Sequence, residues 1–251
     1  QGDSGNDEND ETDEKGEEGE QDERAERVYT DADLAMIDEH FAAERVRGAE
    51  PRYVEDVVPG EDLGVRYRGP LLVSDMIAWL MGNGRSEILP YRLQWKNRQR
   101  MRGFYDRNEF GAWDAVMRVH WDDDYARTVG VARAYDYGML RNAWLMHLVT
   151  DWMGDDALLV SVDDRIKGFN MIGDLSRISG RVTEVDDSTD WPEVVIAVEC
   201  TNQRDETTAF GTIRVRLPSR DRGLPAFPTP PADEGVVEGM LVPEGGPWAS
   251  P

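Results

Sequence analysis

The stretch Val119–Asp155, VHWDDDYARTVGVARAYDYGMLRNAWLMHLVTDWMGD, decides the fold. Its second half, Leu140–Trp152, carries apolar residues on every side of a helical period, whereas a surface helix would show one polar face. We therefore expect a helix that is buried on most sides. Asp136 is a suitable N-cap, Gly138 leaves the backbone of the first turn open to approach, and Gly154 is typical of a C-terminal stop.

Four segments after this helix have the composition of strands. They are Leu158–Phe169, Leu175–Val185, Glu193–Asn202 and Thr207–Leu217. The last two alternate in part between polar and apolar residues, as a sheet with one solvated face does. Polar turn residues separate the strands, so we expect consecutive strands to pair as an antiparallel meander. The pattern predicts an α+β fold in which an antiparallel sheet wraps around a long central helix.

Three shorter elements precede the central helix. A helix is predicted from Thr30 to near Gly48, and a strand is predicted over Leu63–Leu72. Ser74 then caps a short helix over Asp75–Met81. The Gly-Asn-Gly sequence that follows is a helix stop, because it lacks the third glycine and the preceding strand of a dinucleotide-binding motif.

The composition restricts the partners and the location. The chain has 251 residues, of which 51 are acidic and 28 basic, so its formal net charge is −23. Nucleic acid and anionic membranes are therefore not expected as partners, and no apolar run is long enough to cross a bilayer. The single cysteine, Cys200, excludes an internal disulfide and fits the cytoplasm. Abundant arginine with scarce lysine fits either a salt-adapted protein or a GC-rich genome.

The chain divides into a domain and two tails. Residues 1–27 are rich in Asp, Glu and Gly and nearly free of apolar residues, so we expect a disordered acidic tail. Residues 28–217 are expected to form one domain with an N-terminal helix and a basic insertion at 85–118. Residues 218–251 are rich in Pro and Gly and are predicted to form a loose tail. Because the chain begins with Gln1 rather than Met, we also expect a trimmed or partial product.

The segment Arg85–Glu109 is basic in an otherwise acidic chain and has no regular period. Aromatic residues are interleaved with its arginines, and two interpretations remain. The segment is either a lid or rim that meets a phosphorylated ligand, because guanidinium groups suit phosphate oxygens, or a surface insertion whose arginines pair with nearby carboxylates.

The chain has three histidines. His40 is predicted to lie at the surface, and His147, within the apolar helix, is predicted to be a core residue rather than a catalyst. His120 precedes the acidic run Asp122–Asp124, but these acids are adjacent and no second histidine flanks them. We therefore expect no metal site there.

Several short motifs occur in a characteristic order over roughly Tyr53–Leu217. They are Arg68-Gly69-Pro70 before the short helix, His120-Trp121-Asp122 with Tyr125-Ala126 and Gly130, Tyr137-Gly138 at the long helix, Gly173-Asp174, Thr201-Asn202-Gln203 and Gly211-Thr212. In this order and spacing the sequence resembles the MaoC-like acyl-CoA dehydratases, also called (R)-specific enoyl-CoA hydratases. The resemblance implies a hot-dog fold, subunits that form homo- or hetero-oligomers, an acyl-CoA substrate and no separate cofactor.

The resemblance also implies a site. In that family an Asp-x-Asn-Pro-x-His motif supplies a catalytic Asp and His, and a His-Gly pair opens the central helix. His120 stands at the histidine position, whereas the Asp position falls on Ala115 and the histidine of the His-Gly pair is Tyr137. Asp114, one residue away, is the candidate partner of His120 if the loop bulges.

Hydration of an enoyl thioester needs proton transfer and donors for the thioester oxygen. The start of a buried helix offers backbone N–H groups, so Tyr137, Gly138 and Met139 are candidates for binding this oxygen and the substrate. Arg165 and Lys167 are either ligands of the CoA pyrophosphate or ordinary strand-surface charges.

The expected activity is reversible hydration of a 2-enoyl-CoA to a 3-hydroxyacyl-CoA. The alternative is a catalytically degenerate hot-dog subunit that binds acyl-CoA or completes the pocket of a catalytic partner. Hydrolysis of the thioester on the same scaffold is a third possibility.

Overall fold

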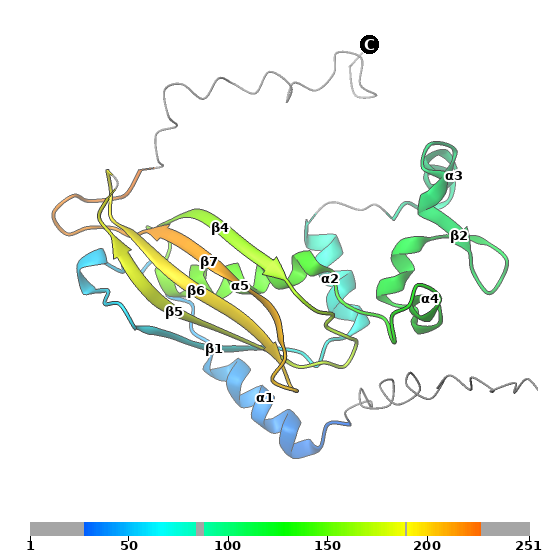
Figure 1. Cartoon of the computed structure of the whole chain (residues 1–251), viewed down its shortest axis with the longest axis horizontal. Helices are drawn as coiled ribbons and strands as arrows, with labels where there is room; N and C mark the ends of the chain where they lie inside the picture. Colours follow the sequence, from blue (N-terminus) through cyan, green and yellow to red (C-terminus); the bar gives the residue numbers. More distant parts are fainter. Residues whose placement is uncertain (1–27, 84–87, 189, 227–251) are drawn as a thin grey trace, which may run out of the picture.

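A five-stranded antiparallel sheet curves around one long helix (Figure 1). The computed structural model describes residues 28–83, 88–188 and 190–226. In spatial order the strands are β1 (Asp62–Arg68), β5 (Ser176–Asp186), β6 (Glu193–Asn202), β7 (Thr207–Arg216) and β4 (Leu158–Ile166). The enclosed helix is α5 (Gly138–Met153). The predicted α+β architecture, an antiparallel sheet around a central helix, is confirmed.

The apolar side chains of α5 form the centre of the core. Leu145, Leu148 and Val149 are at most 1% exposed and pack with inward-facing strand residues such as Ile178 and Ile196. Burying each large aliphatic side chain contributes roughly 1.5–3 kcal/mol. The all-round apolar pattern of the helix is thus explained by the sheet that surrounds it.

The two ends of α5 differ from each other in how well they were predicted. Gly154 is the C-cap with a φ of +81°, a conformation that suits glycine, so the predicted stop is confirmed. The N-cap is Tyr137, and the prediction of Asp136 was wrong. The Asp136 side chain turns into the interior and pairs with Arg141 instead.

The strand order departs from the predicted meander at β4. Strands β5, β6 and β7 pair consecutively, but β4 pairs with β7 and β1 pairs with β5. The connection from Ile166 to Ser176 is not a tight turn, and it is long enough to pass the end of α5. A sheet that curves around a helix can therefore place β4 at the edge opposite β1.

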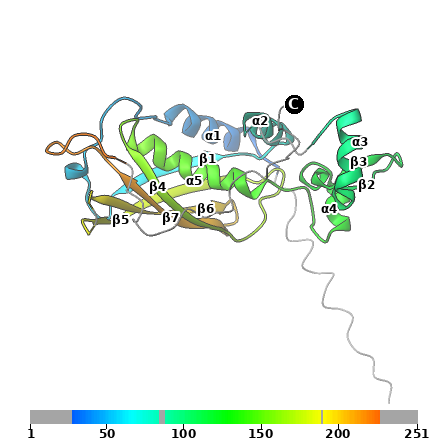
Figure 2. The ribbon, with the colours of Figure 1, turned by 90° about the horizontal axis from the view of Figure 1, so that it is seen from above.

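Two further helices lie on the same side of the sheet as α5 (Figure 2). Helix α1 (Asp31–Ala43) packs on β1, and Thr30 caps it through a reciprocal contact with Asp33. Helix α1 ends at Ala43, before the end predicted near Gly48. Helix α2 (Val73–Asn83) contains the predicted short helix, but it begins before Ser74, so the prediction of Ser74 as its cap was wrong. A 3₁₀ turn, η1 (Val54–Asp56), precedes β1.

Residues 88–134 form a separate lobe at the N-terminal end of α5 (Figure 2). Its elements are α3 (Tyr91–Arg100), η2 (Arg102–Phe104), β2 (Tyr105–Arg107), β3 (Trp113–Ala115), η3 (Val116–His120) and α4 (Asp123–Thr128). The prediction of an irregular basic segment was wrong over α3, because Arg, Leu, Gln and Lys are strong helix formers.

The chain after Pro218 is attached to the body as far as the structure describes it. The Pro218 carbonyl accepts from Val54 N, and Arg220 Nη2 lies 2.6 Å from the Asp56 carboxylate. Residues 218–226 therefore differ from the predicted loose tail. The predicted acidic tail, 1–27, and residues 227–251 lie outside the described residues. Within 28–83, 88–188 and 190–226, no helix has the length and apolarity to span a membrane.

Candidate functional site

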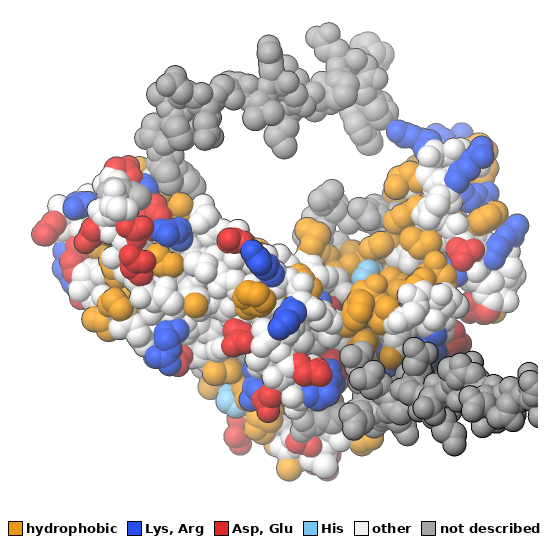
Figure 3. Space-filling model, in the orientation of Figure 1, with side chains coloured by type: hydrophobic (Ala, Val, Ile, Leu, Met, Phe, Trp, Pro, Cys, Tyr) orange, Lys and Arg blue, Asp and Glu red, His pale blue; other side chains and the backbone are white. Residues whose placement is uncertain are grey.

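A cavity of about 170 Å³ lies where α2, the lobe and the start of α5 meet. Its lining residues are Trp79, Leu80, Ile88, Met117, His120, Tyr137, Gly138 and Met139. Most of them are apolar, and Figure 3 shows apolar side chains gathered between the sheet body and the lobe. Among the described lining residues none is Asp or Glu. The structure thus brings together four of the predicted site residues: His120, Tyr137, Gly138 and Met139.

His120 is the last residue of η3, which carries it from the lobe towards α5. Its side chain is buried, and its Nδ1 lies 2.8 Å from the carbonyl oxygen of Tyr135. When Nδ1 donates to this carbonyl, the neutral ring keeps its lone pair on Nε2. Desolvation lowers the pKa of His120, against the opposing effect of the Tyr135 and Asp136 backbone. The burial of His120 therefore favours the neutral ring over the imidazolium.

Aromatic contacts fix the plane of the His120 ring. The Tyr137 ring lies 3.9 Å from it, centroid to centroid, and also stacks on Trp79 at 5.5 Å. Tyr135 meets the imidazole edge-on at 4.9 Å. Tyr137 thereby joins α2, η3 and α5 at the wall of the cavity.

The first turn of α5 meets the same cavity through Gly138 and Met139. Backbone N–H groups in the first turn of a helix have no partner within the helix, and the helix dipole places partial positive charge there. This end of α5 is therefore suited to hold an oxygen that gains negative charge.

Asp114 is not brought to His120. It lies on β3, where its carboxylate accepts from Ala115 N at 2.8 Å, and it lines a different groove of the lobe together with Phe110 and Asp124. The pairing of β3 with β2 is regular at this point, without the bulge that the sequence interpretation required.

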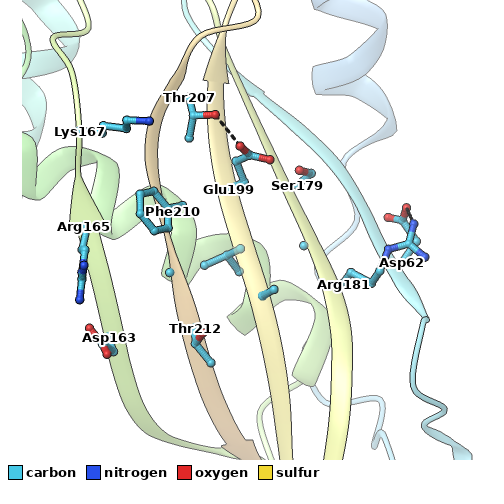
Figure 4. A pocket seen from close by; sticks show the side chains of 14 residues that line it. Asp62, Asp163, Arg165, Lys167, Ser179, Arg181, Glu199, Thr207, Phe210 and Thr212 are labelled. Atoms are coloured by element: carbon cyan, nitrogen blue, oxygen red, sulfur yellow. Dashed lines mark hydrogen bonds and ion pairs between the residues drawn. The ribbon is translucent and has the colours of Figure 1, made fainter.

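Arg165 and Lys167 lie on the outer face of the sheet (Figure 4). Ile166, which lies between them, faces α5. Its Cγ1 is so near Gly138 that a Cβ added to that glycine would lie 3.5 Å from it. Side chains alternate along a strand, so its neighbours point away from the helix. They border an open groove of about 800 Å³ that also includes Glu199, and they do not line the His120 cavity.

The other two histidines lie outside the cavity. His147 was predicted to be a core residue, and this prediction was wrong, since its side chain is 55% exposed and its Nε2 lies 3.7 Å from Asp151. His40 is exposed and packs on Tyr67, so its surface prediction is confirmed. In the described part of the chain, no group of three or more His, Cys, Asp or Glu residues is placed to hold a metal ion.

Sequence reasoning missed one buried polar pair beside the site. The Asp136 carboxylate lies 2.9 Å from Nε of Arg141, and both side chains are fully enclosed. An Asp and an Arg five residues apart at the entrance of an apolar helix were the available signal. The pairing itself depends on the tertiary packing.

No protein-family model and no curated protein sequence matches the chain. Solved structures do match. A MaoC-domain dehydratase from Chloroflexus aurantiacus aligns with a TM-score of 0.50 and 14% identity, covering 74% of this chain and 46% of that one. The (R)-hydratase from A. caviae involved in PHA biosynthesis has a TM-score of 0.49 and 14% identity, covering 66% of this chain and 100% of that one. The ChsH1–ChsH2 complex from Mycobacterium tuberculosis has a TM-score of 0.45 and 18% identity, covering 64% and 98%.

At these identities the likeness concerns the fold. The chain has a hot-dog fold, as the wrapped helix and the strand order indicate. More particularly, this fold is similar to that of the MaoC-domain dehydratase from Chloroflexus aurantiacus, so the resemblance drawn from the sequence is confirmed at the level of the fold.

Proposed function

We propose that the chain binds a CoA thioester with its acyl group in the His120 cavity and reversibly hydrates a 2-enoyl-CoA to a 3-hydroxyacyl-CoA. The observation that carries this proposal is that His120 and the first turn of α5 line one cavity. A base and a group of oxyanion donors are the two requirements of the reaction.

In this proposal His120 handles the proton in both directions. Nε2 takes a proton from water as the water oxygen bonds to C3 of the enoyl group. The electron pair of the double bond moves towards the thioester, whose oxygen gains negative charge and is held by the N–H groups of Gly138 and Met139. The imidazolium then returns its proton to C2, so that one water molecule has been added and the enzyme is unchanged.

The phosphate groups of CoA meet α3 in this proposal. Ile88 lines the cavity, and α3 begins three residues later. Its cations Arg92, Lys96 and Arg100 are spaced to share one helix face. In the part of the chain that the structure describes, no carboxylate pairs with these three side chains. This favours the phosphate-binding interpretation of the basic segment and makes α3 a stronger candidate than the outer-face residues Arg165 and Lys167.

A second candidate function is that of a hot-dog subunit that binds acyl-CoA and completes the pocket of a catalytic partner. It is favoured by the absence of Asp and Glu among the described residues that line the cavity. A second acid or base would then come from another hot-dog subunit. The cytoplasmic location and the homo- or hetero-oligomeric assembly belong to both proposals.

The test uses the purified chain with enoyl-CoA substrates of several chain lengths. Loss of enoyl absorbance with wild type and with His147→Gln, but not with His120→Gln, supports hydration. Calorimetric binding of acyl-CoA without turnover supports the subunit function, and release of free thiol would indicate hydrolysis. If the chain shows no binding and no turnover at any chain length, both proposals are overturned.

A further inference from the structure

The buried pair Asp136–Arg141 takes no part in the mechanism above. Its two side chains are 0% and 2% exposed and lie 2.9 Å apart. Burial raises the pKa of Asp136 to about 7, although Arg141 acts in the opposite direction. Buried ion pairs are often no more stabilising than packed apolar residues. Stability alone therefore does not explain why this pair is here.

Arg141 ties the first turn of α5 to the sheet. Its Nη1 donates to the carbonyl oxygen of Gly168 at 2.6 Å and to that of Thr208 at 2.8 Å. These carbonyls belong to the segment after β4 and to the second residue of β7. The guanidinium is thus fixed by the sheet on one side and holds the Asp136 carboxylate on the other.

Asp136 lies between the two residues that hold the His120 ring. The carbonyl of Tyr135, the preceding residue, is 2.8 Å from Nδ1 of His120, and Tyr137, the following residue, packs on the ring at 3.9 Å. The backbone of Asp136 donates to the Asn170 carbonyl at 2.9 Å. A carboxylate anchored to the sheet through Arg141 therefore sits at the centre of the segment that orients the histidine.

We propose that Asp136 is a positioning residue, which through Arg141 anchors the segment 135–137 so that His120 is held in the Nδ1–H tautomer with Nε2 free to act as the base. The consequence for turnover rests on the proposed function. The consequence for the tautomer does not.

The test is the tautomeric state of His120 in Asp136→Asn, which keeps the shape of the side chain and removes its charge. Long-range ¹H–¹⁵N spectra at pH 8 resolve three imidazoles, and His40→Gln and His147→Gln assign them. We expect wild type to show the Nδ1–H form alone and Asp136→Asn to show a mixture of both neutral tautomers.

Asp151→Asn is the matched control. Asp151 is a buried carboxylate near the other end of α5, and its Oδ2 lies 3.6 Å from Nε of Arg66. Its loss is expected to lower the stability while leaving the His120 tautomer unchanged. If Asp136→Asn does not fold, the double variant Asp136→Asn/Arg141→Met removes both charges and is expected to show the same mixture. An unchanged tautomer in the folded Asp136 variant, or an equal change in Asp151→Asn, overturns the proposal.

Kinetics separate this inference from the proposed function. With a turnover assay, Asp136→Asn is expected to lower kcat at least tenfold with little change in KM, because the base is misdirected while the acyl cavity is intact. If no enoyl-CoA is turned over by wild type, the proposed function fails, and the tautomer measurement still decides the positioning role.

Discussion

The sheet body and the lobe differ in how many apolar side chains each of them buries. In the body, α5 and the strands bury a continuous aliphatic core. In the lobe, α3 has no buried residue, and guanidinium groups stack on aromatic rings, with Arg107 4.4 Å from the Trp113 ring and Arg118 3.7 Å from that of Tyr125. Cation–π contacts also occur on the body, where Arg52 lies 4.4 Å from the Trp152 ring. The two regions therefore differ in the amount of apolar surface that they bury, with such contacts adding to the packing of both.

The candidate site lies where these two regions meet. The body contributes the first turn of α5, and the lobe contributes His120. The proposed oxyanion donors are therefore fixed by the core, whereas the proposed base, His120, is carried by the less buried region and needs separate anchoring. Because of this difference, we expect substitutions in the core of the body to act mainly on stability and substitution of His120 in the lobe to act mainly on chemistry.

The largest expected effect is on chemistry. His120→Gln removes the base, and we expect kcat to fall about 10²- to 10⁴-fold. The glutamine amide can still donate to the Tyr135 carbonyl, so the midpoint of denaturant unfolding should change little. His147→Gln, a change of an exposed histidine on the body, is the control and should keep the wild-type rate. If His120→Gln keeps the wild-type kcat, His120 is not the base of the reaction.

The next effect is on stability and is confined to the body. Leu148→Ala opens a hole in the core and should lower the free energy of unfolding by about 2–5 kcal/mol. Leu93→Ala, at a half-exposed position of α3, should change it by about 0.5 kcal/mol or less. Urea unfolding followed by circular dichroism measures both, and equal losses would show that the lobe and the body share one core.

The body was predictable because its residues obey simple periods. The start of β6 and the end of the helix at Gly154 agree with the sequence pattern, since alternation and capping are local properties. The position of β4 at the far edge was not predictable, because it depends on how the sheet closes around α5. Turn chemistry determines where a strand ends, but the path of a longer connection is set by packing.

The site was predictable only where it coincides with the family motif. His120 and Gly138 were found in this way, and they share a cavity. The pairing of Asp136 with Arg141 has no such motif and arises from burial on all sides. His147 was misassigned because an apolar pattern on all sides predicts a helix with no exposed face, whereas the sheet leaves one side of α5 accessible next to Arg68.

A smaller effect is expected for the cations of the lobe. Replacing Arg92, Lys96 and Arg100 together with Gln should weaken binding of an acyl-CoA about tenfold, since exposed charge interactions contribute up to about 1 kcal/mol each. Binding of the matching N-acetylcysteamine thioester, which has no phosphate, should be unchanged.

The matched control for these cations is on the body. Arg165→Gln/Lys167→Gln removes two exposed charges from the outer face of the sheet and should leave both affinities unchanged. Calorimetry measures the affinities of both variants at low and high salt. The loss of acyl-CoA affinity in the lobe variant should become smaller at high salt, because salt screens the charges. A weaker acyl-CoA affinity in the outer-face variant alone would assign the phosphates to the sheet instead of α3.

The smallest expected effect is the lowering of the His120 pKa and the pH dependence that follows from it. Desolvation lowers the pKa of His120 below the ordinary value of 6.5, because the charged imidazolium is disfavoured where the lobe closes on the body. A histidine with a lowered folded-state pKa contributes stability that is present above pH 6.5 and is lost as the pH falls through the folded pKa. The loss is at most about 1.4 kcal/mol per pH unit. In ¹H NMR the His120 ring should therefore titrate below pH 6.5, and the acidic limb of kcat/KM should follow it. A midpoint at or above 6.5 would mean that the junction is open to water, so that the lobe does not shield the base that it carries.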